Sequence, residues 1–123
     1  MTWKQAQENC HKYNAILAEP MTDYESSKIK ELALRDTTFP DRRYGPWIGA
    51  TDEAKEGRWV WADSNQTVSW NDWANIEPNG GTIENCVQLR QEEEAYKTDE
   101  YKWNDIQCTD KLPSICQIKQ EKN

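Results

Sequence analysis

The apolar positions in the first third of the chain repeat with the period of an α-helix. In residues Thr2–Tyr13 they recur every three or four residues, and Thr2 with Gln5 has the spacing of a capping box. Asp23–Leu34 follows Pro20 and carries a second stripe of the same period. The sequence therefore predicts two amphipathic helices. Their inward faces are expected to hold Trp3, Ala6, Cys10 and Tyr13 in the first helix, and Ile29, Leu32 and Ala33 in the second.

From Pro46 onward the helical period disappears, and short runs rich in tryptophan and β-branched residues replace it. A long polar stretch, Asp63–Glu84, shows no regular pattern. Inside a compact domain such a stretch is either disordered or functional, and its tryptophans favour order. Helices followed by strands predict an α+β domain. The predicted strands are Trp47–Ala50, Arg58–Ala62, Cys86–Arg90, Tyr101–Trp103 and Ser114–Ile118.

Composition narrows the classes of partner. The chain has 123 residues, enough for one domain over 1–123, and a net charge of −7. Such a surface is a poor partner for nucleic acid or anionic membranes, because both are polyanions. No apolar run approaches the roughly 20 residues needed to cross a bilayer, so membrane insertion is not expected. The seven tryptophans fall largely in strand-like runs and predict a tryptophan-rich core.

Four cysteines are compatible with two disulfides or with a metal site. A zinc site has little support, because there is no Cys-x-x-Cys pair and the lone His11 lies on a predicted helix. An even count in an acidic domain favours disulfides and an oxidising compartment. Three connectivities are possible. We favour Cys10–Cys116, which would tie the chain ends together, with Cys86–Cys108.

Three carboxylates and two carboxamides gather in two short segments beside cysteines. Neither histidine nor thiolate is among them. Oxygen ligands of this kind suit Ca²⁺, which takes six to eight of them, whereas zinc and copper prefer nitrogen or sulfur. The sequence therefore predicts a calcium site that water or the hydroxyls of a ligand complete. Its expected ligands are Glu77, Asn79, Glu84, Asn104 and Asp105.

In their order and spacing, these landmarks resemble a C-type lectin domain over nearly the whole chain. The resemblance implies that fold: two helices packed on small antiparallel sheets, with a long calcium-binding loop region. This chain starts almost at the first helix, so the N-terminal strand usual in the family is expected to be short or missing. The motifs are Cys10, Trp47-Ile48-Gly49, Glu56-Gly57-Arg58-Trp59, Glu77-Pro78-Asn79, Glu84-Asn85-Cys86, Trp103-Asn104-Asp105, Cys108 and Cys116.

The resemblance also implies a sugar site. In the family, the main calcium ion and its five side-chain ligands bind two vicinal sugar hydroxyls, and the proline of Glu77-Pro78-Asn79 is typically cis. Carboxylates only accept hydrogen bonds, whereas amides also donate, so the order of Glu and Asn sets the polarity of the network. Glu-Pro-Asn accompanies mannose-type sugars, which are mannose, glucose, N-acetylglucosamine and fucose.

Many family members carry an auxiliary calcium site, and Asp52, Glu56 and Glu84 match ligands of that site. Two positions depart from the pattern. Gly80 stands where an oxygen-bearing side chain is usual, and Asn85 replaces a common acid. The sequence leaves the occupancy of this site open, with ordinary turn residues as the alternative.

These features together predict a secreted, calcium-dependent lectin for terminal mannose-type glycans on glycoproteins or microbial surfaces, and family analogy suggests a role in innate immunity. Few contacts per sugar imply weak single-site affinity, so homo-oligomers or repeated glycans would be needed. Two alternatives are an acidic mineral-associated matrix protein using Glu92-Glu93-Glu94, and a calcium-independent protein-binding module. An enzyme is not expected, because metal-bound carboxylates stay ionised and cannot act as the raised-pKa acid.

Two further positions are singled out by pattern. Asn65-Gln66-Thr67 is a glycosylation acceptor sequence at Asn65. Gln91–Lys102 is acidic and predicts a solvated loop, with the alternative that Tyr96 or Tyr101 reaches a second sugar ring.

Overall fold

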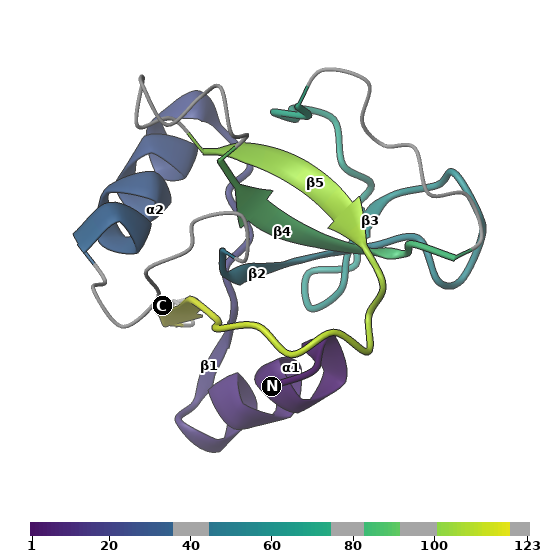
Figure 1. The fold of residues 1–123 in the computed structure, drawn as a ribbon, viewed down its shortest axis with the longest axis horizontal. Coiled ribbons are helices and arrows are strands. Elements are labelled where there is room, and N and C mark those ends of the chain that lie inside the picture. The colour runs from purple at the N-terminus through teal and green to yellow at the C-terminus, as the bar shows by residue number, and fades with distance from the viewer. Residues whose placement is uncertain (36–44, 75–82, 92–100, 119–123) are drawn as a thin grey trace, which may run out of the picture.

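The computed structural model describes residues 1–35, 45–74, 83–91 and 101–118, which are drawn in colour in Figure 1. Several predicted positions lie outside these ranges: Glu77, Pro78, Asn79, Gly80, Glu92-Glu93-Glu94 and Tyr96. No helix within the described ranges is both long enough and apolar enough to cross a membrane.

The first predicted helix is confirmed as α1, Trp3–Lys12. Thr2 is its N-cap, and the reciprocal hydrogen bonds between Thr2 and Gln5 form the predicted capping box. Tyr13 was expected on the buried face, and this was wrong, because it is 76% exposed. Tyr13 caps the helix, and the chain turns at Asn14 (φ 56°), so its side chain leaves the helical stripe.

The second helix, α2, spans Asp23–Arg35 and buries Ile29 and Ala33 as predicted. Leu32 is 54% exposed, which contradicts the expected stripe. The buried face runs through Ser26, Ile29 and Ala33. At 100° per residue, Leu32 lies roughly 90° from the centre of that face, which explains its exposure.

Two antiparallel sheets make up the β structure. The larger has the order β3-β2-β4-β5, and the smaller pairs β1 with β6. In Figure 1 α2 lies against one end of the larger sheet, while α1 lies beside the smaller sheet. The strands are β1 Ala15–Leu17, β2 Trp47–Thr51, β3 Val60–Trp61, β4 Cys86–Arg90, β5 Lys102–Ile106 and β6 Cys116–Ile118.

The α+β class is confirmed, but the strand ends differ from the prediction. Only β4 has its predicted bounds, and β1 was missed because three residues after a helix show no period. The largest shift concerns β5. The prediction ended this strand at Trp103, whereas the structure continues it to Ile106. Asn104 and Asp105 therefore lie within a strand and not in the loop after one.

The tryptophan-rich core is confirmed. Trp47, Trp61 and Trp103 are fully buried, and Trp3 is nearly so. Trp103 lies at the centre of a group of rings that meet edge to face, with centroids 5.4–5.9 Å apart. Such contacts stabilise aromatic pairs beyond their buried area. The partners of Trp103 in this group are Trp61, Trp70 and Trp73.

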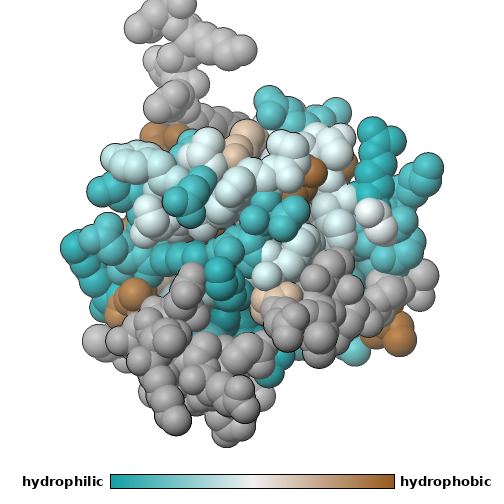
Figure 2. Space-filling view, turned by 90° about the horizontal axis from the view of Figure 1, so that it is seen from above, coloured by the Kyte–Doolittle hydropathy of each residue, from teal (hydrophilic) through white to brown (hydrophobic). Residues whose placement is uncertain are grey.

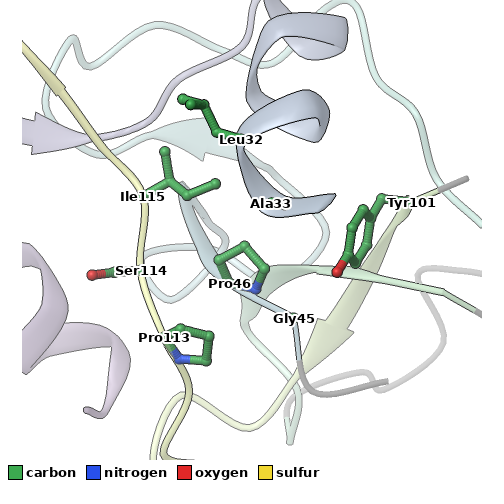
Figure 3. A pocket seen from close by; sticks show the side chains of 8 residues that line it. All are labelled: Leu32, Ala33, Gly45, Pro46, Tyr101, Pro113, Ser114 and Ile115. Carbon is green, nitrogen blue, oxygen red and sulfur yellow. The ribbon is translucent and has the colours of Figure 1, made fainter. Parts of the chain in front are cut away.

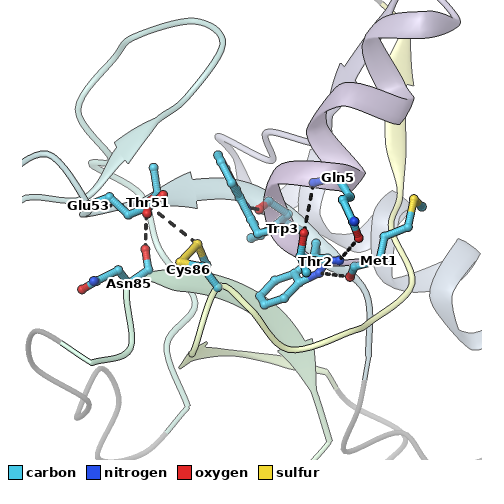
Figure 4. The surroundings of a disulfide bond; sticks show 11 residues. Met1, Thr2, Trp3, Gln5, Thr51, Glu53, Asn85 and Cys86 are labelled. Atoms are coloured by element: carbon cyan, nitrogen blue, oxygen red, sulfur yellow. Dashed lines mark hydrogen bonds between the residues drawn. A yellow bond between two sulfur atoms is a disulfide. The ribbon is translucent and has the colours of Figure 1, made fainter.

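The favoured disulfide connectivity is present. Cys10–Cys116 joins α1 to β6, and Cys86–Cys108 joins the start of β4 to the segment after β5. Figure 4 shows the second bridge beside Thr51 and Asn85. The Thr51 hydroxyl donates a hydrogen bond to the Asn85 carbonyl oxygen at 2.7 Å. This contact holds the end of β2 against the residues that lead into β4.

Candidate metal centre

The turn after β2 places a buried carboxylate beside the start of β4. The Asp52 backbone N–H donates to the Asn85 carbonyl oxygen at 3.1 Å, so this turn lies against the segment that contains Glu84. Asp52 is 1% exposed, and its Oδ2 accepts a hydrogen bond from the Gly57 backbone N–H at 2.8 Å. Gly57 has φ 82°, which favours glycine and allows the turn to close around the carboxylate.

The other carboxylate oxygen of Asp52, Oδ1, is buried and accepts no hydrogen bond from the residues that the structure describes. An unpaired buried oxygen of a carboxylate is costly, because the water that would solvate it is gone. The Glu56 carboxyl approaches Asp52 within hydrogen-bonding reach, but it can donate only when it carries a proton. A cation would satisfy both carboxylates without that proton.

The crowding of carboxylates shifts the pKa of Glu56. Its pKa is raised, first by its approach to the Asp52 carboxyl within hydrogen-bonding reach and then by burial, followed by repulsion from Asp52 and Asp105. The Gly57 backbone N–H opposes the rise. Like charges at short range disfavour ionisation. Glu56 and Asp105 are therefore close enough to interact, although one lies in the turn after β2 and the other in β5.

Glu84 belongs to the same group of acids. Burial is the largest cause of its raised pKa, and the charges of Asp105 and Asp110 raise it further, against a smaller opposing effect of Arg90. Asp110 was not singled out in the sequence, where it is an isolated acid after Cys108. We call Asp52, Glu56, Glu84 and Asp105 the acid cluster. Asp105 is 1% exposed and interacts with both glutamates.

Asn104 is held by a different neighbour. The register of β4 and β5 pairs Asn104 with Gln88, and Asp105 with Val87. Successive side chains of a strand point to opposite faces, so the two residues leave β5 on different sides. The Asn104 Nδ2 donates to Gln88 Oε1 at 2.9 Å, and the Gln88 Nε2 donates to the Gly45 carbonyl oxygen at 3.3 Å.

Sequence reasoning missed Gln88, although a polar residue in the middle of an apolar strand was a signal. Gln88 is fully buried and fixes which way the Asn104 amide is turned. Neighbours that orient metal ligands in this way commonly affect metal affinity.

The structure thus brings part of the predicted ligand set together. Glu84 and Asp105 are neighbours, and Asn104 adjoins Asp105 in β5. Glu56, an expected auxiliary ligand, interacts with Asp52 and more weakly with Asp105, so the main and auxiliary positions influence each other electrostatically. Glu77 and Asn79 lie outside the described residues, and their part in the site stays a prediction.

Neither of two hollows found in the surface contains the acid cluster. The pocket in Figure 3 lies between α2, Pro46 and Pro113, and its volume is about 30 Å³, which suits water but not a sugar. Tyr101 lines it and is 3% exposed, so the alternative that Tyr101 reaches a second sugar ring was wrong.

A larger groove of about 630 Å³ lies beside α2 and β6. The buried Glu19 lines it, and burial raises the pKa of its carboxyl, while hydrogen bonds from the Asp63 and Ser64 backbone N–H groups lower it. Two backbone N–H groups donate to this acid, whereas one, from Gly57, donates to Asp52. Figure 2 shows another property of the surface: on the face drawn there, hydrophilic residues predominate and hydrophobic ones are scattered.

Asn65 lies in an exposed turn and has φ 62°. Its backbone N–H donates to the Trp61 carbonyl oxygen at 2.8 Å, while the residue itself faces solvent. Glycosylation at Asn65 is sterically compatible with this position and stays a prediction.

Known proteins share both the sequence pattern and the fold. Residues 1–118 match the lectin C-type domain family. Salivary C-type lectin 2 of Aedes albopictus is 35% identical over 98% of this chain and 79% of its own length. The carbohydrate-recognition domain of cow CD23, solved in the presence of a GlcNAc₂Man₃ oligosaccharide, has a TM-score of 0.74 at 27% identity, covering 98% and 82% of the two chains.

A Ca²⁺-dependent type II antifreeze protein in its Ca²⁺-free form has a TM-score of 0.76 at 28% identity, covering 94% of this chain and 82% of that one. The predicted fold of two helices with small antiparallel sheets is the fold of these proteins. Members of this group are binding domains and not enzymes, in agreement with the expectation from the sequence. The chain belongs to the C-type lectin domain family.

Proposed function

We propose that this domain is a calcium-dependent lectin that binds mannose-type sugars through the ion. The acid cluster carries the proposal. Asp105 lies close enough to Glu56 and Glu84 to raise both pKa values, and within the described ranges nothing donates a hydrogen bond to the buried Oδ1 of Asp52. Carboxylates crowded against one another, with an oxygen left unpaired, are the donor set that a hard divalent cation such as Ca²⁺ prefers.

Glu84, Asn104 and Asp105 would hold the main ion together with Glu77 and Asn79, and Asp52 and Glu56 would hold an auxiliary ion with Glu84. When bound, calcium offers open coordination positions to two vicinal hydroxyls. The protein contributes the polarity of the surrounding hydrogen bonds, since carboxylates accept and amides also donate. Gln88 restricts the Asn104 amide to one orientation.

An extracellular location fits the two disulfides, which persist in oxidising compartments. Salivary C-type lectins are among the relatives. The ligands would be terminal mannose-type glycans on glycoproteins or microbial surfaces, in an innate-immune setting. Weak single-site binding makes a homo-oligomer or clustered glycans part of the same proposal.

The direct test is a glycan array read with calcium and with a chelator, together with calorimetric titration of calcium. We expect signal on mannose-, fucose- and N-acetylglucosamine-terminated glycans that chelation abolishes. Calcium binding without any glycan signal would favour the alternative of a mineral-associated protein. Ligand binding that survives chelation would favour the calcium-independent protein-binding module.

Sugar preference has its own test. The double substitution Glu77→Gln with Asn79→Asp exchanges a hydrogen-bond acceptor for a donor and the reverse. We expect it to shift preference from mannose toward galactose in a competition assay, with calcium affinity largely kept. Unchanged mannose preference would show that these two side chains do not set the polarity of the site.

A further inference from the structure

Asp72 holds two lysines from distant parts of the chain. Its Oδ1 accepts from Lys102 Nζ at 2.9 Å, and its Oδ2 accepts from Lys30 Nζ. Lys30 lies in α2 and Lys102 begins β5, so one carboxylate connects a helix, a strand and the segment before residue 75. We call Asp72, Lys30 and Lys102 the Asp72 clamp. The side chains of Asp72 and Lys30 are 14% and 18% exposed, so these charges are shielded from solvent more than a surface pair is.

The backbone next to the clamp is paired with β5. Trp103 N–H donates to the Asp72 carbonyl oxygen, and Ala74 N–H donates to the Trp103 carbonyl oxygen, both at 2.9 Å. The Trp73 ring meets the Trp103 ring edge to face, with centroids 5.4 Å apart. Residues 72–74 are thus fastened to the strand position directly before Asn104.

Chain geometry makes this fastening relevant to the calcium site. Glu77 follows Ala74 by three residues in the sequence. Asn104 and Asp105 directly follow Trp103. The point from which the chain departs toward Glu77 is therefore held beside the strand that carries the other predicted ligands.

We infer that Lys30, Asp72 and Lys102 are positioning residues, which hold Ala74, the last described residue before the Glu77-Pro78-Asn79 motif, beside the strand that carries Asn104 and Asp105. This inference rests on the proposed calcium-dependent function. None of the three residues is a ligand. They act by holding residues 72–74 against β5, so substituting them should lower calcium affinity.

Lys102→Met is the decisive variant, because two explanations predict opposite changes in calcium affinity. Lys102 lies two and three residues before Asn104 and Asp105, so removal of its positive charge favours a nearby cation by simple electrostatics. Loss of the clamp has the opposite effect. We expect calcium affinity by calorimetry to fall, on the order of tenfold, as for other residues that orient ligands. Lys102→Arg, which keeps the charge and a donor to Asp72, should restore most of the affinity.

Asp72→Asn supplies a second variant with a matched control. It leaves two ammonium groups facing each other, and calcium affinity should fall by a similar factor. Asp63→Asn removes the same charge from another tertiary pair, in which Asp63 Oδ1 and His11 Nε2 are 2.8 Å apart. This control should change calcium affinity less than about twofold at 0.15 M salt, where exposed charges beyond about 8 Å are screened.

Melting temperatures in chelator verify that each variant is folded. If the wild type binds calcium and Lys102→Met binds it equally or more tightly, the clamp does not position the site. The proposed function would then stand without it. A wild type that binds no calcium would overturn both.

Discussion

The acid cluster and the Asp72 clamp both contain carboxylates shielded from water, but the charges beside those carboxylates differ. In the clamp, two ammonium groups neutralise one carboxylate. In the acid cluster, neighbouring carboxylates raise the pKa values of Glu56 and Glu84, against a smaller opposing effect of Arg90 on Glu84, and Oδ1 of Asp52 receives no hydrogen bond from the described residues. A buried charge is tolerated when it is paired. Among the described residues, the buried Oδ1 of Asp52 lacks the kind of partner that Asp72 has, and a cation is a partner that fits.

Glu19 provides a third case. It is as buried as Asp52, yet two backbone N–H groups satisfy one of its oxygens, and no cation is needed there. Acidity alone therefore does not mark the metal centre. Both acids receive backbone donors on one oxygen, and Asp52 differs in that its Oδ1 is buried without a hydrogen bond from the described residues.

Removal of the Cys86–Cys108 disulfide should produce the largest change in the acid cluster. In the chain-entropy model, a bridge across 22 residues stabilises the fold by about 3 kcal/mol. We expect Cys86→Ala with Cys108→Ala to lower the free energy of urea unfolding by about that amount in chelator. Calcium affinity should fall as well, because the bridge lies between Glu84 and Asp110.

The Cys10→Ala/Cys116→Ala double variant separates the effect on global stability from the effect on calcium affinity. This bridge spans 106 residues, so its loss should cost about 5 kcal/mol in the same model. It joins α1 to β6, away from the acid cluster, and any fraction that stays folded should bind calcium normally. Equal loss of calcium affinity in both double variants would show that the first bridge acts through global stability alone.

Neutralising one acid in the acid cluster and one in the clamp should affect the melting temperature in chelator differently, and Glu84→Gln tests the first. Because its charge is unfavourable without calcium, neutralising Glu84 should leave the melting temperature in chelator unchanged or higher. Asp72→Asn should lower it. The stabilisation by calcium, about 2.7 kcal/mol at a hundred times Kd for the wild type, should be largely lost in Glu84→Gln.

Thermal melts with chelator and with calcium measure both quantities. A Glu84→Gln variant that is destabilised in chelator as strongly as Asp72→Asn would mean that the two regions do not differ in the way described. Retention of the full calcium effect would remove Glu84 from the set of ligands.

Acidification should have a smaller, graded effect. Glu56 and Glu84 have pKa values above the usual 4.5, so the folded state without calcium binds their protons more tightly than the unfolded state does. As pH falls from 7 through that raised range, these two groups add stability in chelator, whereas calcium must displace more protons and binds more weakly. The difference between the two melting temperatures should therefore shrink from pH 7 to pH 5. A constant difference down to pH 4 would contradict this linkage.

Much of the architecture could be predicted from local pattern. Thr2 and Gln5 predicted the start of α1, because a capping box depends on residues three apart in sequence. Cys86–Arg90 was identified because apolar strands between turn residues are recognisable locally. Leu32 was placed wrongly, since its period is compatible with the core, and only packing shows which part of the stripe faces the sheet.

The candidate site divides in the same way. Side-chain chemistry alone predicted oxygen ligands and a hard cation, because ligand preference is a property of the side chain. It also predicted Glu84 and Asp105 as two of the ligands. It did not indicate Gln88, Asp110 or the Asp72 clamp, whose roles depend on strand register and on contacts between distant segments.

What this sequence determined by itself was therefore the kind of element, the kind of ligand atom and the family pattern, all of which are carried by residues close together in the chain. Tertiary structure alone decided which acids receive a partner. Among the described residues, the chain brings Lys30 and Lys102 to Asp72, whereas Asp52 receives the Gly57 backbone N–H and lies against the Glu56 carboxyl. Electrostatic energy depends on distance in space, and those distances arise only when the sheet, the turn after β2 and α2 have packed together.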